Sequence, residues 1–182
     1  QAAESAGLQI NREYWRDITP EAATAGTRPL GDHLLASLPF AGAASGGTAG
    51  REQTALVAAD RRGNAVACVF SMGQPFGHGQ LLSGIFLATA GAPAGAPVLV
   101  SNPNTEILLA AIAGGDGGAV VERLADQTVE ARVPLAEALR QPHGGLINAI
   151  VCPRGLPNYP ESCTAASDPA GRGLAAVGEP QG

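Results

Sequence analysis

Thr54 is the residue whose position most suggests chemistry, because it stands directly ahead of a predicted β-hairpin in the stretch REQTALVAADRRGNAV, residues 51–66. A threonine hydroxyl is a weak nucleophile at neutral pH and attacks an acyl group only when a nearby base accepts its proton. A threonine at the start of a β-rich run is also a common strand residue, because β-branched side chains favour strands. The sequence therefore allows two interpretations of Thr54, as a nucleophile or as an ordinary strand residue.

The other hydroxyl and imidazole side chains give weaker signals. Ser71 closes the second strand of the predicted hairpin, where a serine is usually a solvated hydroxyl. His33, His78 and His143 stand singly in loop-like surroundings, away from any Cys or Glu at ligand spacing. The pattern predicts neither a metal nor another cofactor.

The three cysteines match no paired metal-ligand spacing. Cys68 alternates with apolar neighbours, which predicts a thiol packed in the core. Cys152 and Cys163 could pair in an oxidising compartment, but their spacing alone does not decide it. The glycines between 114 and 118 follow neither GxGxxG nor GxxxxGK[ST], so we expect them to interrupt a helix rather than bind phosphate.

These residues must be positioned by a small set of elements. Two apolar strands at 55–59 and 65–70 flank the turn residues 60–64, which predicts a β-hairpin. Both strands are apolar on both faces, as expected in a sheet that is covered on each side. The further expected elements are helices at 32–38, 105–112, 118–126 and 135–140, strands at 84–88, 98–100, 146–152 and 162–166, and a turn at 167–169. Strands, then helices, then strands indicate an α+β layered fold.

Composition excludes several classes of partner. The chain has 182 residues, which fits one domain with a core. The net charge is -5 and no five Lys or Arg cluster together, so we expect no nucleic acid partner. No apolar run of 18 residues suggests membrane insertion, and the first residues do not have the pattern of a signal peptide. Only 15% of residues are charged, which suggests that part of the surface is covered by a partner.

The composition of the chain changes at about residue 53. Residues 1–53 form an irregular N-terminal arm and linker, because proline, glycine and small residues separate short apolar patches. The regular pattern begins at Thr54 and continues through residues 54–182.

Four separated segments of this second part resemble the small-subunit region of γ-glutamyltranspeptidases, in the order of that family. They are ADRRGNAV at 59–66, FGHG at 76–79 with SGIFL at 83–87, PLAEALRQP at 134–142, and ASDPAGRGLAA at 166–176. The resemblance covers about residues 54 to 178.

The resemblance implies an N-terminal-nucleophile hydrolase fold, an αββα sandwich, whose precursor cleaves itself just before a threonine. That threonine attacks a γ-glutamyl amide, and its freed α-amine acts as the base. Counting strictly back from Gly63 places Gln53 at the nucleophile position, and a shortening by one residue places Thr54 there. Ser71 falls where the family has a second hydroxyl that hydrogen-bonds the nucleophile.

Other parts of the family's site are missing from this sequence. Gly73 replaces an asparagine, and residues 88–92 lack the acidic group that would pair with the substrate's α-amino group. The serine pair that holds the substrate carboxylate falls in a stretch that is shortened between Ala90 and Val98. Asn104 and Thr105 stand after Pro103, where the family has the glycine pair of its oxyanion hole.

These departures favour a degenerate γ-glutamyltranspeptidase-like protein that acts as a non-catalytic accessory or scaffold subunit. Another polypeptide would supply the missing large-subunit region, or a larger complex would complete the sheet. The alternative is an active γ-glutamyl or other acyl hydrolase or transferase that uses Thr54 after autocleavage, with Ser71 beside it. A third possibility is that the polypeptide is a fragment of a longer precursor. The resemblance favours a place outside the cytoplasm.

Overall fold

The structure is a computed structural model, and an antiparallel six-stranded sheet forms its centre. It describes residues 23–38, 53–72, 76–77, 79, 81–82, 85–86, 95–142 and 146–178. The strand order is β1-β2-β7-β8-β9-β10, and every neighbouring pair is antiparallel. The strands are β1 (Gly26–Leu30), β2 (His33–Ser37), β7 (Ala96–Asn102), β8 (Ile107–Gly114), β9 (Ile147–Leu156) and β10 (Thr164–Ser167).

A separate two-stranded hairpin consists of β3 (Gln53–Ala59) and β4 (Ala65–Ser71). Its register is continuous from the Gln53–Ser71 pair to the Ala59–Ala65 pair. Asp60 fixes the turn, since its carboxylate accepts hydrogen bonds from the backbone N–H groups of Arg62 (2.8 Å) and Asn64 (3.0 Å) and from the Asn64 side chain (2.8 Å). These bonds, with that of the Asn64 side chain first, lower the pKa of Asp60 below its usual range.

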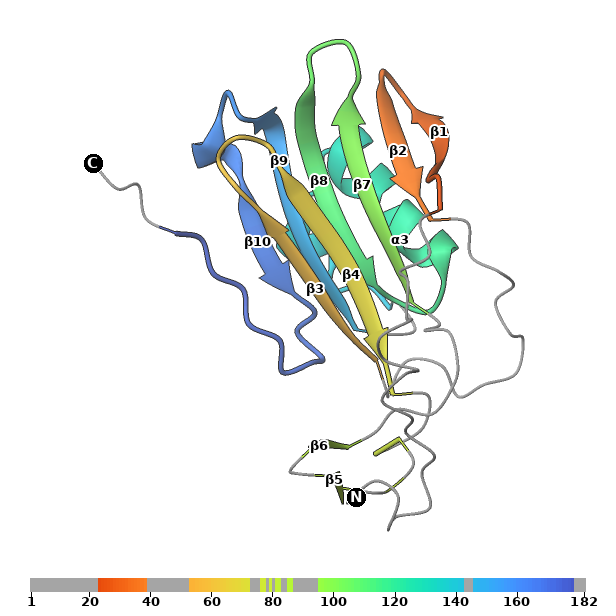
Figure 1. Cartoon of the computed structure of the whole chain (residues 1–182). Coiled ribbons are helices and arrows are strands. Elements are labelled where there is room, and N and C mark those ends of the chain that lie inside the picture. The colour runs from red at the N-terminus through yellow and green to blue at the C-terminus, as the bar shows by residue number, and fades with distance from the viewer. Residues whose placement is uncertain are drawn as a thin grey trace.

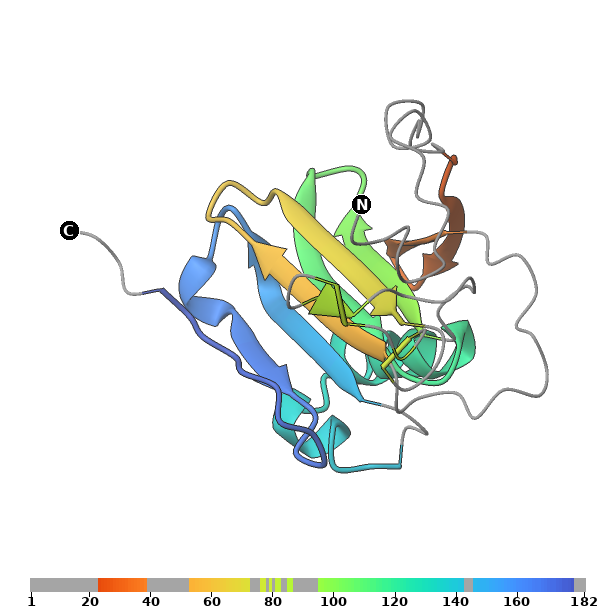
Figure 2. The ribbon, with the colours of Figure 1, turned by 60° about the horizontal axis from the view of Figure 1, so that its bottom comes forward.

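The hairpin and the helices lie on opposite faces of the six-stranded sheet, as Figure 1 shows with β3 and β4 in front and α3 behind. The hairpin packs over β7, β8 and β9. On the other face lie α3 (Gly118–Ala125), the π-helical turn η1 (Asp126–Glu130) and α4 (Leu135–Ala138). The tilted view in Figure 2 shows the same three layers. A short 3₁₀ turn, η2 (Pro160–Ser162), joins β9 to β10.

The core lies mainly between the sheet and the helices. Side chains of β7, β8 and β9, such as Val98, Ile112 and Ile147, are buried against Val121 and Leu124 of α3. Each of these five side chains is at most 1% exposed. A smaller cluster on the hairpin side consists of Leu108, Cys152 and Leu156, packed by residues that include Ala59, Ala65 and Cys163.

The hairpin is covered on only one of its faces. Its sheet-facing apolar residues are Ala55, Val57, Ala59, Ala65, Ala67 and Val69, and such small side chains allow close approach of the two layers. The opposite face exposes Leu56 (49%), Val66 (44%) and Phe70 (53%). The expectation that both faces of this hairpin are covered is therefore not met within the described chain.

Two predicted helices are wrong. Residues 33–37 form strand β2, because they pair with β7 as well as with β1. Residues 107–114 form strand β8, which is buried from Leu108 to Gly114 because helices cover one face and the hairpin covers the other. A strand buried on both faces has no alternating pattern, so its short apolar run resembles a buried helix.

Residues 26–37, in the part of the chain expected to be an irregular arm, form β1 and β2 of the central sheet. The remaining predicted elements are present in the described residues, with small shifts of their ends. The hairpin, the strand around residues 98–100, the helix that begins at Gly118 and the two late strands are all present. The helix expected at 135–140 is regular only over α4, after which Leu139 and Arg140 continue as a turn. Of the strand expected at 84–88, the described part is β6 (Ile85–Phe86), paired with β5 (Leu81–Leu82).

Cys152, on β9, and Cys163, directly before β10, form a disulfide, so the two cysteines whose spacing left the pairing open are joined. Cys68 is a free, half-buried thiol on β4. Within the described residues, no helix combines the length and apolar character needed to cross a bilayer.

Candidate functional site

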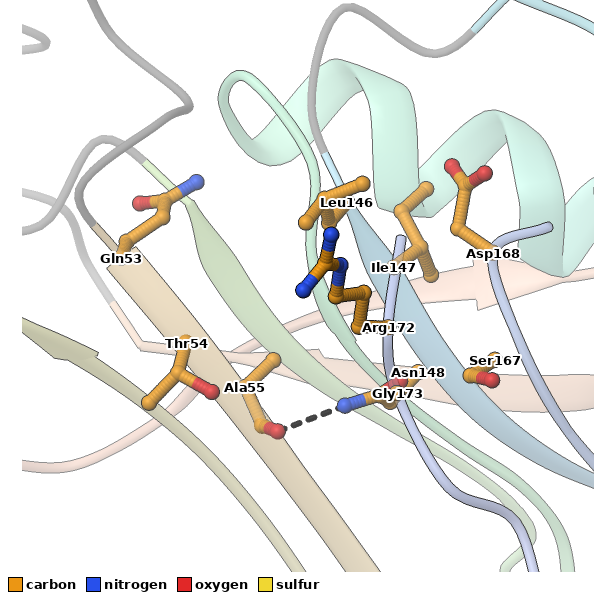
Figure 3. A pocket seen from close by; sticks show the side chains of 10 residues that line it. All are labelled: Gln53, Thr54, Ala55, Leu146, Ile147, Asn148, Ser167, Asp168, Arg172 and Gly173. Carbon is orange, nitrogen blue, oxygen red and sulfur yellow. Dashed lines mark hydrogen bonds between the residues drawn. The ribbon is translucent and has the colours of Figure 1, made fainter. Parts of the chain in front are cut away.

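A cavity of about 250 Å³ lies where the start of β3 meets β9 and the C-terminal segment. Figure 3 shows the side chains that line it. The lining residues are Gln53, Thr54, Ala55, Leu146, Ile147, Asn148, Ser167, Asp168, Arg172 and Gly173. The cavity thus contains Thr54, the predicted nucleophile, and we take it as the candidate site.

Gln53 is held by both ends of its amide. Its Nε2 donates to the carbonyl oxygen of Gly115 (2.6 Å), and its Oε1 accepts from the backbone N–H of Gly95 (2.7 Å). Gly95 precedes β7 and Gly115 follows β8, so one side chain ties β3 to the ends of two central strands. A Cβ on Gly95 would meet the Gln53 Nε2 at 2.8 Å, which explains why a glycine stands there.

Thr54 projects from the opposite face of the hairpin. Residues that are directly opposite in an antiparallel pair share a face, and successive residues alternate between faces. Thr54 is opposite Phe70, whereas Gln53 is opposite Ser71. Thr54 is exposed, on the same outer face as Leu56 and Phe70.

Ser71, the second predicted site residue, is half-buried on the sheet-facing side of the hairpin. The structure therefore does not bring the side chains of Thr54 and Ser71 to one face. The residue that shares a face with Ser71 is Gln53, at the position that the strict count from Gly63 selects. The pairing runs without a bulge from Gln53 to Ala59, so Gln53 and Thr54 lie on opposite faces of β3.

Asn148 connects the hairpin to the main sheet. Its Nδ2 donates to the carbonyl oxygen of Ala55 (2.6 Å), as the dashed line in Figure 3 shows. Asn148 lies on β9 between the buried residues Ile147 and Ala149. Its amide therefore projects from the face of β9 that carries the hairpin and forms part of the cavity wall.

The C-terminal segment forms the remaining wall. Asp168 is 8% exposed; its Oδ1 accepts from the backbone N–H of Ala170 (2.8 Å), and its own N–H donates to the carbonyl oxygen of Ile147 (2.8 Å). Gly171 packs against Leu146, and a Cβ on Gly173 would lie 2.7 Å from the Cβ of Ser167. Close approach at these two glycines holds the segment against β9 and β10 and places Arg172 between them.

Other predicted site positions lie elsewhere. Asn104 and Thr105 are in the turn between β7 and β8, whereas Gln53 contacts the other ends of these strands. The position expected for the oxyanion hole is therefore not part of the cavity. Gly73, residues 88–92, His78 and His143 lie outside the described residues. Within residues 23–178, as far as they are described, no three His, Cys, Asp or Glu side chains gather as a metal site would require.

Sequence reasoning missed the glycines around the Gln53 amide. Residues 115–117 connect β8 to α3 and are not a break within a helix, because the segment before them is a strand. Gly114, Gly115 and Gly117 all have positive φ angles, of 115°, 70° and 105°. The dense glycines were the available signal, since a strand followed by glycines and a helix is a typical location for a site.

No protein-family model matches the sequence, and no curated protein matches it. The structure is similar to that of a highly active mutant of gamma-glutamyltranspeptidase from Pseudomonas nitroreducens. The TM-score is 0.52 and the sequence identity 16%, and the match covers 70% of this chain and 100% of that chain. The chain shares the fold of a γ-glutamyltranspeptidase. The mostly antiparallel sheet with few helices agrees with this likeness.

Proposed function

We propose that this chain is a non-catalytic relative of γ-glutamyltranspeptidases that serves as an accessory or scaffold subunit of a larger assembly. The observation that carries the proposal is the pairing of Gln53 with Ser71 on the sheet-facing side of the hairpin. A primary amide is not a nucleophile, and both ends of this amide are already hydrogen-bonded to backbone groups.

The chemistry of Thr54 supports the same proposal. In the intact chain the nitrogen of Thr54 belongs to the peptide bond with Gln53, and its lone pair is delocalised into the carbonyl group. Such a nitrogen cannot accept the proton of the hydroxyl. Thr54 also lies on the other face of the hairpin from Ser71, so it lacks the partner hydroxyl that the resemblance implies.

The partner in this proposal covers the outer face of the β3–β4 hairpin. Leu56, Val66 and Phe70 are neighbours on this face, since Leu56 is opposite Cys68, and Val66 and Phe70 lie two residues to either side of Cys68 on β4. An exposed apolar strip of this kind is typical of an interaction surface. With a helical layer supplied by the partner, the sheet, the hairpin and the two helical layers would form the αββα sandwich.

The disulfide supports a place outside the cytoplasm, because disulfides persist in oxidising compartments. An accessory subunit in such a compartment fits the resemblance as well. The competing function is an acyl hydrolase or transferase that uses Thr54, and it is favoured by one observation, the position of Thr54 in the wall of a cavity.

The intact mass of the purified chain separates these functions. We expect a single uncut species with no turnover of a γ-glutamyl anilide, and the Thr54→Ala variant should have the same mass and the same background rate. A product that begins at Thr54, together with turnover that Thr54→Ala abolishes, would establish the enzyme instead.

The scaffold part of the proposal is tested by isolating the chain with its partners and measuring the mass of every associated chain. Phe70→Asp should abolish the association because it places a charge in the apolar strip. Arg61→Asp, at the exposed hairpin turn, serves as the control and should leave the association intact.

A further inference from the structure

We propose that the cavity between β3, β9 and the C-terminal segment binds a small organic monocarboxylate, held by the guanidinium of Arg172. This inference concerns binding without chemical conversion. It depends neither on a partner chain nor on cleavage before Thr54.

The cationic group of the site is free to bind a ligand. Arg172 lines the cavity and forms no ion pair with the described part of the chain, in contrast to Arg28, which contacts Glu122 (3.1 Å), and Arg154, which contacts Glu161 (3.4 Å). Figure 3 shows its guanidinium extending from the C-terminal segment toward Leu146. A guanidinium presents parallel N–H donors that match the two oxygens of a carboxylate.

The backbone that carries Arg172 follows a turn and lies close against the sheet. The N–H of Gly171 donates to the carbonyl oxygen of Asp168 (3.0 Å), which closes a turn directly before Arg172. On the other side, Gly173 lies so close to Ser167 and Asn148 that a Cβ there would be 2.7 Å from Ser167 Cβ and 3.1 Å from Asn148 Oδ1. The turn and the close approach place the Arg172 backbone at the cavity wall.

The rest of the lining selects the kind of anion. Ser167 supplies a hydroxyl group that can donate to a carboxylate oxygen, and Leu146 and Ile147 supply apolar surface for a short carbon chain. Asp168 is the only other charged residue in the lining, and its carboxylate disfavours a second negative charge on the ligand. Phosphate and dicarboxylates should therefore bind more weakly than a monocarboxylate.

The volume limits the size of the ligand. At about 250 Å³ the cavity lies below the roughly 300–1,000 Å³ that is typical of pockets for drug-sized ligands. A carboxylate with a chain of a few carbon atoms is the ligand that fits both this volume and the single cation.

The test is a titration of the full chain with sodium butyrate at constant ionic strength, followed by amide chemical shifts. We expect a dissociation constant of about 1–10 mM, because Arg172 is largely exposed and exposed ion pairs are weak. Shifts should centre on Thr54, Ser167 and Arg172. Butyramide, the neutral isostere, should bind about two- to fivefold more weakly, since an exposed ion pair is worth at most roughly a factor of five. Inorganic phosphate should also bind more weakly, because the Asp168 carboxylate disfavours its second negative charge.

Variants assign the effect to Arg172. Arg172→Ala should weaken butyrate binding about two- to fivefold. Arg172→Lys should weaken it less, because it keeps the charge but loses the planar fork. The control is Arg61→Ala, which removes another exposed cation, at the far end of the hairpin, and should leave butyrate binding unchanged. Amide spectra of each variant establish that it is folded. Equal binding of butyrate by wild type and Arg172→Ala, equal binding of butyramide, or shifts that follow every surface arginine would each overturn the proposal.

Discussion

Gln53 lies directly opposite Ser71 across the β3–β4 pair, so both side chains project toward the main sheet while Thr54 projects away from it. The side chain opposite Ser71 on this face of the hairpin is thus an amide that is hydrogen-bonded at both ends. The first expected consequence is structural, because the same amide connects β3 to Gly95 and Gly115.

Gln53→Glu should destabilise the chain by about 1–3 kcal/mol near neutral pH. An ionised carboxylate can accept from the N–H of Gly95 but cannot donate to the carbonyl oxygen of Gly115. Chemical denaturation would measure the change in the free energy of unfolding. The control is Gln127→Glu, because the Gln127 amide donates to the Gln141 side chain at the exposed surface (2.8 Å). There the free energy of unfolding should fall by less than about 0.5 kcal/mol. Equal losses for the two variants would show that the Gln53 bridge is not important for stability.

Truncation of the outer face of the hairpin should cost the isolated chain little. Leu56 is 49% exposed, so Leu56→Ala should lower the free energy of unfolding by less than about 1 kcal/mol. Ile112 on β8 is 0% exposed, so Ile112→Ala should lower the free energy of unfolding by about 2–5 kcal/mol. Thermal or chemical unfolding of the two variants checks the difference. A large loss at Leu56 would mean that another part of the chain already covers this face.

Removal of the disulfide should cost about 2–3 kcal/mol, because it closes a loop between cysteines separated by 11 residues. The double variant Cys152→Ala/Cys163→Ala tests this by chemical denaturation, with Cys68→Ala as the control. Alkylation of the unfolded, unreduced chain should modify Cys68 alone, and reduction should make all three cysteines reactive. Three reactive thiols before reduction would contradict the pairing.

The hairpin turn should weaken in acid. The pKa of Asp60 is lowered in the folded chain, mainly by the side-chain hydrogen bond from Asn64, so its stabilising effect is complete above the unfolded pKa of about 3.9. This effect is lost as the pH falls through the lower folded pKa. Asn64→Ala should raise the pKa of Asp60 toward its ordinary value, which a titration of the carboxyl carbon by NMR would measure. Arg62→Ala should raise it less, since the charge of Arg62 is the smallest of the causes, and an equal rise would contradict the role of Asn64.

The hairpin could be predicted because its signal is local. Asp60, Gly63 and Asn64 specify the turn by their own hydrogen bonds and, for Gly63, by a positive φ of 89°. Strand β8 could not be predicted from its sequence. A strand shows alternating apolar and polar residues only when one of its faces meets water, and β8 is buried on both faces. Residues 33–37 form a strand because they pair with β7, some sixty residues further along the chain. No local sequence pattern indicates such a distant pairing.

The candidate site was predictable only in part for a similar reason. The sequence identified the right end of β3 but left open which of two adjacent residues faces the interior, and in a strand a shift of one residue reverses the face. Continuous pairing from Gln53 to Ala59 fixes that face. The contributions of Gly95, Gly115 and Asn148 come from strands that are distant in sequence, so they become visible only once the sheet is assembled.

The link between Cys152 and Cys163 has a practical result for anyone who digests this protein. Arg154 lies inside the ring that the link closes, with its side chain 57% accessible beside Glu161. A protease that nicks the backbone after this arginine would leave two pieces still joined by sulfur, travelling as one band. They would separate only when a thiol reagent opens the ring.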